Sequence, residues 1–72
     1  MSIYEEIGEM IRTLREEKGY SREWLALECD INIKHLADIE HGSANPTIDA
    51  LLKIADGLGL EFRNPLVVPV RV

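Results

Sequence analysis

Hydrophobic residues recur at intervals of three and four over the first part of the chain, which is the pattern of an amphipathic helix. These residues are Ile3, Ile7, Met10, Ile11 and Leu14. Ser2 and Glu5 have the spacing of a capping box, and Gly19 suits the left-handed position that follows a helix. The pattern therefore predicts a first helix from Ile3 to Lys18.

Two shorter helices follow, and each begins after a residue type that caps helices well. Ser21 precedes a predicted helix from Arg22 to Cys29, and Asn32 precedes a second from Ile33 to His41, which Gly42 closes. The inward faces of these helices are expected to carry Leu25, Ala26, Cys29, Leu36 and Ile39. Only a short turn separates the two helices, which is the layout of a helix-turn-helix motif.

A fourth helix is expected after a loop at residues 43–46, with Thr47 as its cap and its end at Gly57 and Gly59. Its apolar residues cover a wide arc, and they are Ile48, Leu51, Leu52, Ile54, Ala55 and Leu58. The sequence thus divides into a helical domain at residues 1–60 and a tail at residues 61–72.

The tail is rich in β-branched residues, which favours an extended segment from Leu66 to Val72. Pro69 lacks an amide donor, so this strand is expected to pair on one side only. One hypothesis is that the tail pairs with the same strand of a second copy and forms a homodimer. The residues expected at that interface are Leu66, Val67, Val68 and Val70. The alternative is that the tail folds back over its own core through Phe62, Leu66 and Val68.

Many positions along the chain closely resemble the XRE family of lambda-repressor-like regulators. They are Leu14-Arg15, Gly19-Tyr20-Ser21, Glu23, Leu25-Ala26, Ile39-Glu40, Gly42, Pro46-Thr47, Leu51, Ile54-Ala55 and Leu58-Gly59. The resemblance spans about Ile7 to Leu60. It implies an all-α fold, a lambda-repressor-like bundle of four to five helices containing a helix-turn-helix. Here the β-prone tail stands in place of a fifth helix.

The resemblance also implies a function, which is sequence-specific binding of double-stranded DNA to regulate transcription. The expected protein is a homodimeric repressor on a palindromic operator. The residues that the family would place at DNA are Ser21, Arg22, Asn32, Ile33, Lys34, His35, Asp38, Ser43 and Asn45. Lys34 is the strongest candidate for a base contact, because lysine donates to guanine O6 and N7. Arg15 and Glu40 are expected to form a structural ion pair.

Four residues depart from the family pattern. Arg22 replaces the usual glutamine and suits a phosphate contact, whereas Asp38 brings a carboxylate that phosphates repel unless it accepts from a cytosine amino group. Asp30 stands where glycine is usual, in a left-handed turn that aspartate tolerates better than most residues do. Trp24 stands where the family often has a polar residue. It either joins the core or offers an exposed contact to a partner protein.

The net charge of −5 weakens the DNA-binding interpretation, because nucleic-acid-binding domains normally carry a basic surface. A protein-interaction module of the same fold, of the antitoxin or anti-repressor type, therefore remains an alternative. No catalytic constellation stands out, and we expect no enzyme activity, no cofactor and no metal. The single cysteine, Cys29, is expected to be structural. The acidic N-terminus and the lack of a long apolar run indicate a cytoplasmic protein with no membrane partner.

Overall fold

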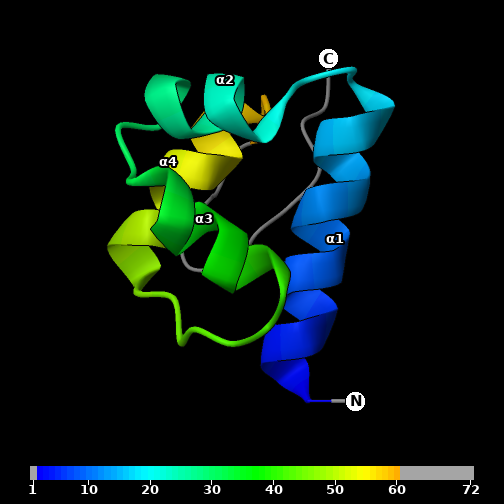
Figure 1. The fold of residues 1–72 in the computed structure, drawn as a ribbon, viewed down its shortest axis with the longest axis vertical. Coiled ribbons are helices and arrows are strands. Elements are labelled where there is room, and N and C mark those ends of the chain that lie inside the picture. Colours follow the sequence, from blue (N-terminus) through cyan, green and yellow to red (C-terminus); the bar gives the residue numbers. More distant parts are fainter. Residues whose placement is uncertain (1, 61–72) are drawn as a thin grey trace.

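The computed structural model describes residues 2–60, and this part of the chain folds as four helices (Figure 1). They are α1 (Ile3–Glu17), α2 (Arg22–Glu28), α3 (Ile33–Glu40) and α4 (Ile48–Gly57). All four begin where the sequence predicts, and the first three end one residue earlier, because Lys18, Cys29 and His41 are the C-caps. Residues 2–60 contain no strand. The expectation of an all-α helix-turn-helix bundle is confirmed.

The helices begin at side-chain caps that the sequence identifies correctly. At the start of α1, Ser2 Oγ accepts from the Glu5 amide at 3.2 Å, and the Ser2 amide donates to Glu5 Oε1 at 2.9 Å. Thr47 Oγ1 accepts from the Ala50 amide at the start of α4. These bonds satisfy amide groups that have no partner within the helix, so each helix start is defined locally.

Asp30, in the turn between α2 and α3, adopts a left-handed backbone conformation with φ of 55°. The sequence predicts this conformation from the family pattern. A non-glycine residue in the left-handed region is strained by contact between its Cβ and the following carbonyl, at a cost of roughly 1–2 kcal/mol.

Replacement of Asp30 with glycine is therefore expected to raise the free energy of unfolding by about 0.5 kcal/mol. The gain is smaller than the strain because glycine loses more chain entropy on folding, by roughly 0.5–1 kcal/mol. Urea denaturation measures the change. Asp30→Ala is the matched comparison, since it keeps the strained Cβ and removes the carboxylate. If the two variants were equally stable, the left-handed backbone at residue 30 would not be strained by a Cβ.

The core forms where α3 packs against both α1 and α2, with α4 behind α3 (Figure 1). The residues expected on the inward faces of the second and third helices are all buried, as are Ile11, Ile54, Ala55 and Leu58. Two members of the predicted α1 stripe are not in this core, because Ile3 is 60% exposed and Met10 is 53% exposed. Ile48 and Leu52 of α4 are exposed as well. The apolar pattern is therefore wider than the core that residues 2–60 build.

Two glycines permit close contacts between helices. A Cβ on Gly8 of α1 would overlap the carbonyl oxygens of Ile39 and Glu40 at the end of α3. A Cβ on Gly57 would come within 2.5 Å of Cys29 Sγ. The sequence assigns the end of the fourth helix to Gly57 and Gly59, and Gly57 is the last residue of α4, while Gly59 adopts a left-handed conformation with φ of 76°. Gly57 thus makes room for Cys29 at the end of the helix.

The predictions for the tail lie outside the described residues. They comprise the domain boundary after residue 60, the extended segment, and the dimer contacts at Leu66, Val67, Val68 and Val70.

Within the described part of the chain, none of the helices has both the length and the apolar composition needed to cross a membrane.

Candidate nucleic-acid interface

The α2–turn–α3 unit positions most of the residues that the sequence assigns to DNA. The turn is closed by the Ile31 amide, which donates to the Ala26 carbonyl at 2.9 Å. Leu25 and Leu36 are completely buried and anchor the two helices in the core. The first turn of α3 carries Ile33, Lys34 and His35, and all three are exposed. The unit therefore presents the N-terminal half of α3 to solvent, which is the part of a recognition helix that enters the major groove.

Ser21 and Asn32 are exposed, and both have structural roles as caps. Ser21 Oγ accepts from the Trp24 amide at 3.0 Å at the start of α2. Asn32 Oδ1 accepts from the amides of Lys34 and His35 at 2.8 and 3.3 Å at the start of α3. The Asn32 oxygen is thus occupied, and the amide nitrogen of its side chain is the group left to donate to DNA.

Lys34 is the most accessible cation of the recognition helix, with 83% of its side chain exposed. Its Nζ lies 3.3 Å from Asp38 Oδ2, one turn later on the same face. Such an exposed pair contributes little to stability, about 0.3–0.5 kcal/mol, so a base or phosphate can displace it at small cost. Asp38 therefore pairs with Lys34 on the surface of α3. Its carboxylate lowers the net positive charge of that surface.

The loop after α3 carries the last two predicted contacts, Ser43 and Asn45, and both are exposed. The Ser43 amide donates to the Asp38 carbonyl at 3.0 Å, and Ser43 Oγ donates to the same carbonyl at 3.2 Å. This pair of bonds ties the start of the loop to the end of α3. The loop and the recognition helix consequently present their polar groups as one surface.

Behind this surface lies a buried cluster of charges centred on Glu40, whose side chain is 0% exposed. Arg15 of α1 donates from Nε to Glu40 Oε2 at 2.8 Å and from Nη2 to Oε1 at 3.1 Å. Arg15 Nη1 donates to the Tyr20 carbonyl at 2.9 Å. The hydrogen bond to Glu40 is the main cause that raises the pKa of Arg15 above its ordinary value. The pair expected from the resemblance is therefore present, and it joins α1 to the recognition helix.

Arg22 is the third member of this cluster, which the sequence did not indicate. It donates from Nε and Nη2 to Glu40 Oε1 at 3.2 and 3.1 Å, while 31% of its side chain remains exposed. The sequence assigns Arg22 to a DNA phosphate. Both hydrogen bonds to Glu40 come from the Nε and Nη2 groups of Arg22. The Nη1 group of Arg22 takes part in neither bond. The structure thus adds a structural partner to a residue expected to serve DNA alone.

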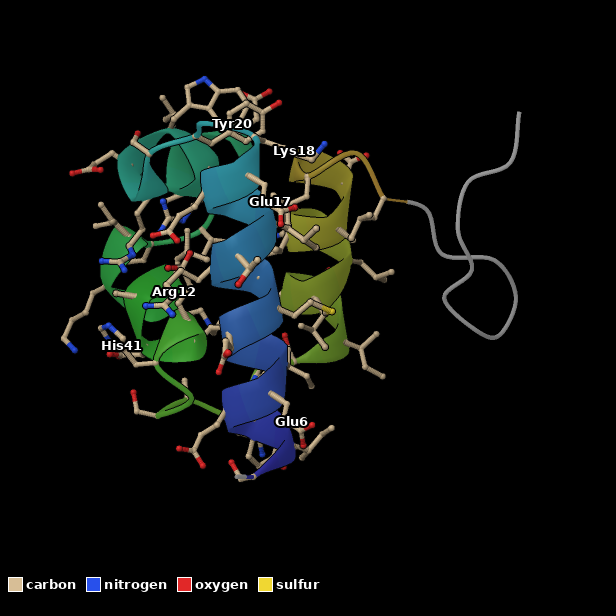
Figure 2. The ribbon with its side chains drawn as sticks, turned by 90° about the vertical axis from the view of Figure 1, so that its right-hand side faces the viewer. Glu6, Arg12, Glu17, Lys18, Tyr20 and His41 are labelled. Carbon is tan, nitrogen blue, oxygen red and sulfur yellow. The ribbon has the colours of Figure 1, made fainter. Side chains whose placement is uncertain are left out.

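Trp24 does not join the core, and the first of the two alternatives for it is wrong. It is 41% exposed and stacks on Tyr20, with ring centroids 4.2 Å apart and an angle of 32° between the ring planes. Figure 2 shows Tyr20 at the end of the molecule where α1 meets α2, beyond Lys18. The aromatic pair forms a surface feature next to the start of α2.

Cys29 and the possible metal ligands are the other chemically notable groups among residues 2–60. Cys29 is buried, and its burial raises the pKa of the thiol, which disfavours the reactive thiolate. The described residues contain no group of three or more His, Cys, Asp or Glu side chains that could hold a metal ion.

The two short helices, the closed turn and the exposed first turn of α3 define a helix-turn-helix domain. Comparison with known families agrees, because residues 11–63 match the helix-turn-helix family HTH_3. The chain belongs to this family and is a DNA-binding regulator of the XRE type. The expected resemblance is thus confirmed.

Relatives include both short control proteins and longer regulators. The chain is 38% identical over 60 residues to the control protein C.BamHI of Bacillus amyloliquefaciens, covering 82% of this chain and 74% of the relative. The restriction-modification controller protein C.AhdI of Aeromonas hydrophila has a similar structure, with a TM-score of 0.79, 31% identity, and coverage of 81% of this chain and 88% of that one. The regulator SlrR of Bacillus subtilis is 39% identical over 57 residues, which are 78% of this chain but 38% of SlrR.

Proposed function

We propose that this protein represses transcription by occupying a palindromic operator as a homodimer, with α3 in the major groove. The observation that carries the proposal is the exposed first turn of α3, which presents Ile33, Lys34 and His35 above a rigid core. Lysine donates to guanine O6 and N7, and an isoleucine side chain packs against a thymine methyl group. The similarity to C.BamHI and C.AhdI supports a role in gene control.

The charges on this face support a dimer. Arg22 and Lys34 are its two full cations, and each is paired with a carboxylate of α3. A single domain therefore neutralises few phosphates, so its affinity is low and falls gently as salt rises. Linking two such domains makes the second contact intramolecular and raises the overall affinity. Two recognition helices about 34 Å apart would match successive turns of the major groove.

Replacement of Lys34 with alanine is expected to weaken operator binding by about 5- to 150-fold, the range that corresponds to the 1–3 kcal/mol of one good base contact. The preference at one base pair of each half-site should also relax. The experiment selects random duplex DNA with the purified protein at low salt and then measures binding of the recovered site by wild type and variant. A palindromic consensus is the expected result.

Lys53→Ala is the matched control, because Lys53 of α4 also pairs with an aspartate one turn away, at 3.4 Å from Asp49. This variant should keep the same base preference as wild type. Recovery of a non-palindromic site would contradict the homodimer. Equal losses for Lys34→Ala and Lys53→Ala would contradict base reading by α3.

A second function is favoured by one surface feature, the Tyr20–Trp24 stack, and Leu27, three residues after Trp24 on α2, is exposed as well. Exposed aromatic residues are frequent anchors of protein interfaces, so this surface suits a module that binds another protein. The two functions differ in their response to salt. A DNA-binding regulator is retained on DNA at low salt and released as salt rises, whereas a pure protein-binding module shows no retention at any salt concentration.

A further inference from the structure

An open apolar groove lies between α1 and α4, on the side of α1 that does not pack against α3. Its volume is about 220 Å³, and its lining is almost entirely hydrophobic. The lining residues are Ile7, Met10, Ile11, Leu14, Leu51, Ile54, Ala55, Leu58 and Leu60. Figure 2 shows α1 and α4 side by side, with side chains from both helices in the space between them. Core residues such as Ile11, Ile54 and Leu58 form the floor of the groove, and the exposed residues Met10 and Leu60 lie at its rim.

The size and chemistry of this groove fit an aromatic side chain. A closed apolar cavity of about 150 Å³ is enough to accept benzene, and this groove is larger. Met10 at its rim is 53% exposed, and methionine adapts its shape to aromatic neighbours. Apolar surface of this kind is stabilised by about 25 cal/mol for each Å² removed from water. The groove therefore favours an apolar segment as its occupant.

The chain itself supplies such a segment directly at the rim. Leu60 lines the groove and is the last described residue, and Phe62 follows two positions later. In an extended chain, residues two apart point to the same side, so an extended tail would bring Phe62 to the same side as Leu60. Because this segment is tethered to the groove, its effective concentration there is in the millimolar range. A second molecule in dilute solution does not reach that concentration, so the tethered segment is favoured as the occupant of the groove.

The charges beside the groove also match the tail. Glu6, Glu9 and Glu17 line a shallow depression on α1 together with Met10 and Leu14, which belong to the groove as well. Figure 2 shows Glu6 and Glu17 towards opposite ends of α1. Residues 61–72 contain two arginines, Arg63 and Arg71, and a single acidic residue, whereas the protein as a whole is acidic. The side chains of the tail thus carry a net charge of +1, and the rim of the groove is acidic.

The tail is long enough to reach along the whole helix. Twelve extended residues span about 40 Å, whereas the 15 residues of α1 rise about 22 Å. We propose that the groove between α1 and α4 is the docking site for residues 61–72 of the same chain, with the Phe62 ring against Met10. This intramolecular contact is independent of DNA binding. It leaves the backbone edge of the tail accessible to a second copy.

The composition of the chain allows a direct test on the full-length protein, because it contains one phenylalanine and two methionines, Met1 and Met10. A deuterated sample with ¹³C-methyl methionine and protonated phenylalanine rings is examined by NMR. The expected result is a nuclear Overhauser effect between the Met10 methyl group and the Phe62 ring. In Phe62→Ala, the Met10 methyl resonance should lose its ring-current shift. Trp24→Ala, which removes an aromatic ring that does not line the groove, should leave this resonance unchanged.

A mixed sample identifies the source of the tail. Equal amounts of protein labelled only at methionine and protein labelled only at phenylalanine give this Overhauser effect only when the contact joins two copies. We expect none in the mixture. A signal in the mixture would show that copies exchange their tails, and absence of the signal from the doubly labelled wild type would show that the tail does not occupy the groove. Either result overturns the proposal.

Discussion

Replacement of Arg15 with alanine is expected to lower the free energy of unfolding by about 3 kcal/mol, which is the lower end of the cost of removing one partner from a buried ion pair. The Arg15 side chain makes three hydrogen bonds, two to Glu40 and one to the Tyr20 carbonyl. Without it, Glu40 Oε2 and the Tyr20 carbonyl lose the donors that they have in the structure. Arg22 still neutralises part of the buried carboxylate, which keeps the loss below the maximum.

Urea denaturation followed by circular dichroism measures this effect, and the melting temperature should fall by about 10 °C or more. Arg22→Ala is the matched control, because it removes an arginine from the same carboxylate at a partly exposed position. Its cost should be about 1 kcal/mol or less. If the two variants were equally stable, Glu40 would not depend on Arg15, and the cluster would not be the brace between α1 and α3.

Replacement of Gly8 with alanine is expected to destabilise the protein by about 1–3 kcal/mol, the usual cost of overpacking. Helix propensity alone predicts the opposite, since alanine is favoured over glycine inside a helix by roughly 1 kcal/mol. In this structure, however, the added Cβ makes the substitution destabilising. It would lie 2.6 Å from the Glu40 carbonyl oxygen and closer still to the Ile39 carbonyl oxygen. Both obstacles are backbone atoms, so α1 and α3 would have to move apart.

The same denaturation experiment tests this expectation, with Glu9→Ala as the control in the neighbouring exposed position of α1. That control should change the free energy of unfolding by no more than about 0.5 kcal/mol. Higher stability of Gly8→Ala would mean that α1 and α3 do not approach as closely as described. Because Glu40 carries one of the two obstructing carbonyls, Gly8→Ala should also weaken the bond between Glu40 and Arg15. The two stability losses are therefore not expected to be additive.

Local features of this fold could be predicted from sequence because they depend on residues close together in the chain. The capping box of Ser2 and Glu5, the cap at Asn32 and the left-handed conformation of Asp30 each act within a few positions. Helix starts and the inward faces of α2 and α3 follow from the same short-range patterns. The Arg15–Glu40 pair spans 25 residues, and it was expected only because the sequence resembles a family.

Features that depend on contacts across the fold were missed. Arg22 was expected to bind DNA alone, since nothing near it in sequence indicates that Glu40, 18 residues later, would hold its guanidinium. Gly8 gave no signal, because a glycine inside a helical pattern is equally consistent with a neutral surface position. Met10 and Ile3 matched the periodicity of the apolar stripe, but periodicity does not show how far along a helix its neighbour extends. The DNA contacts themselves remain predictions.

The caps at Ser21 and Asn32 set a limit on how the specificity of this domain can be changed. Both side chains face the proposed DNA surface while holding the first turns of α2 and α3 in place. Substitution at either position would disturb a helix start as well as the surface, so a change in binding there would be hard to interpret. Ile33, Lys34 and His35 have no such capping role. A library that varies these three positions and retains both caps would search for new operators on an intact scaffold.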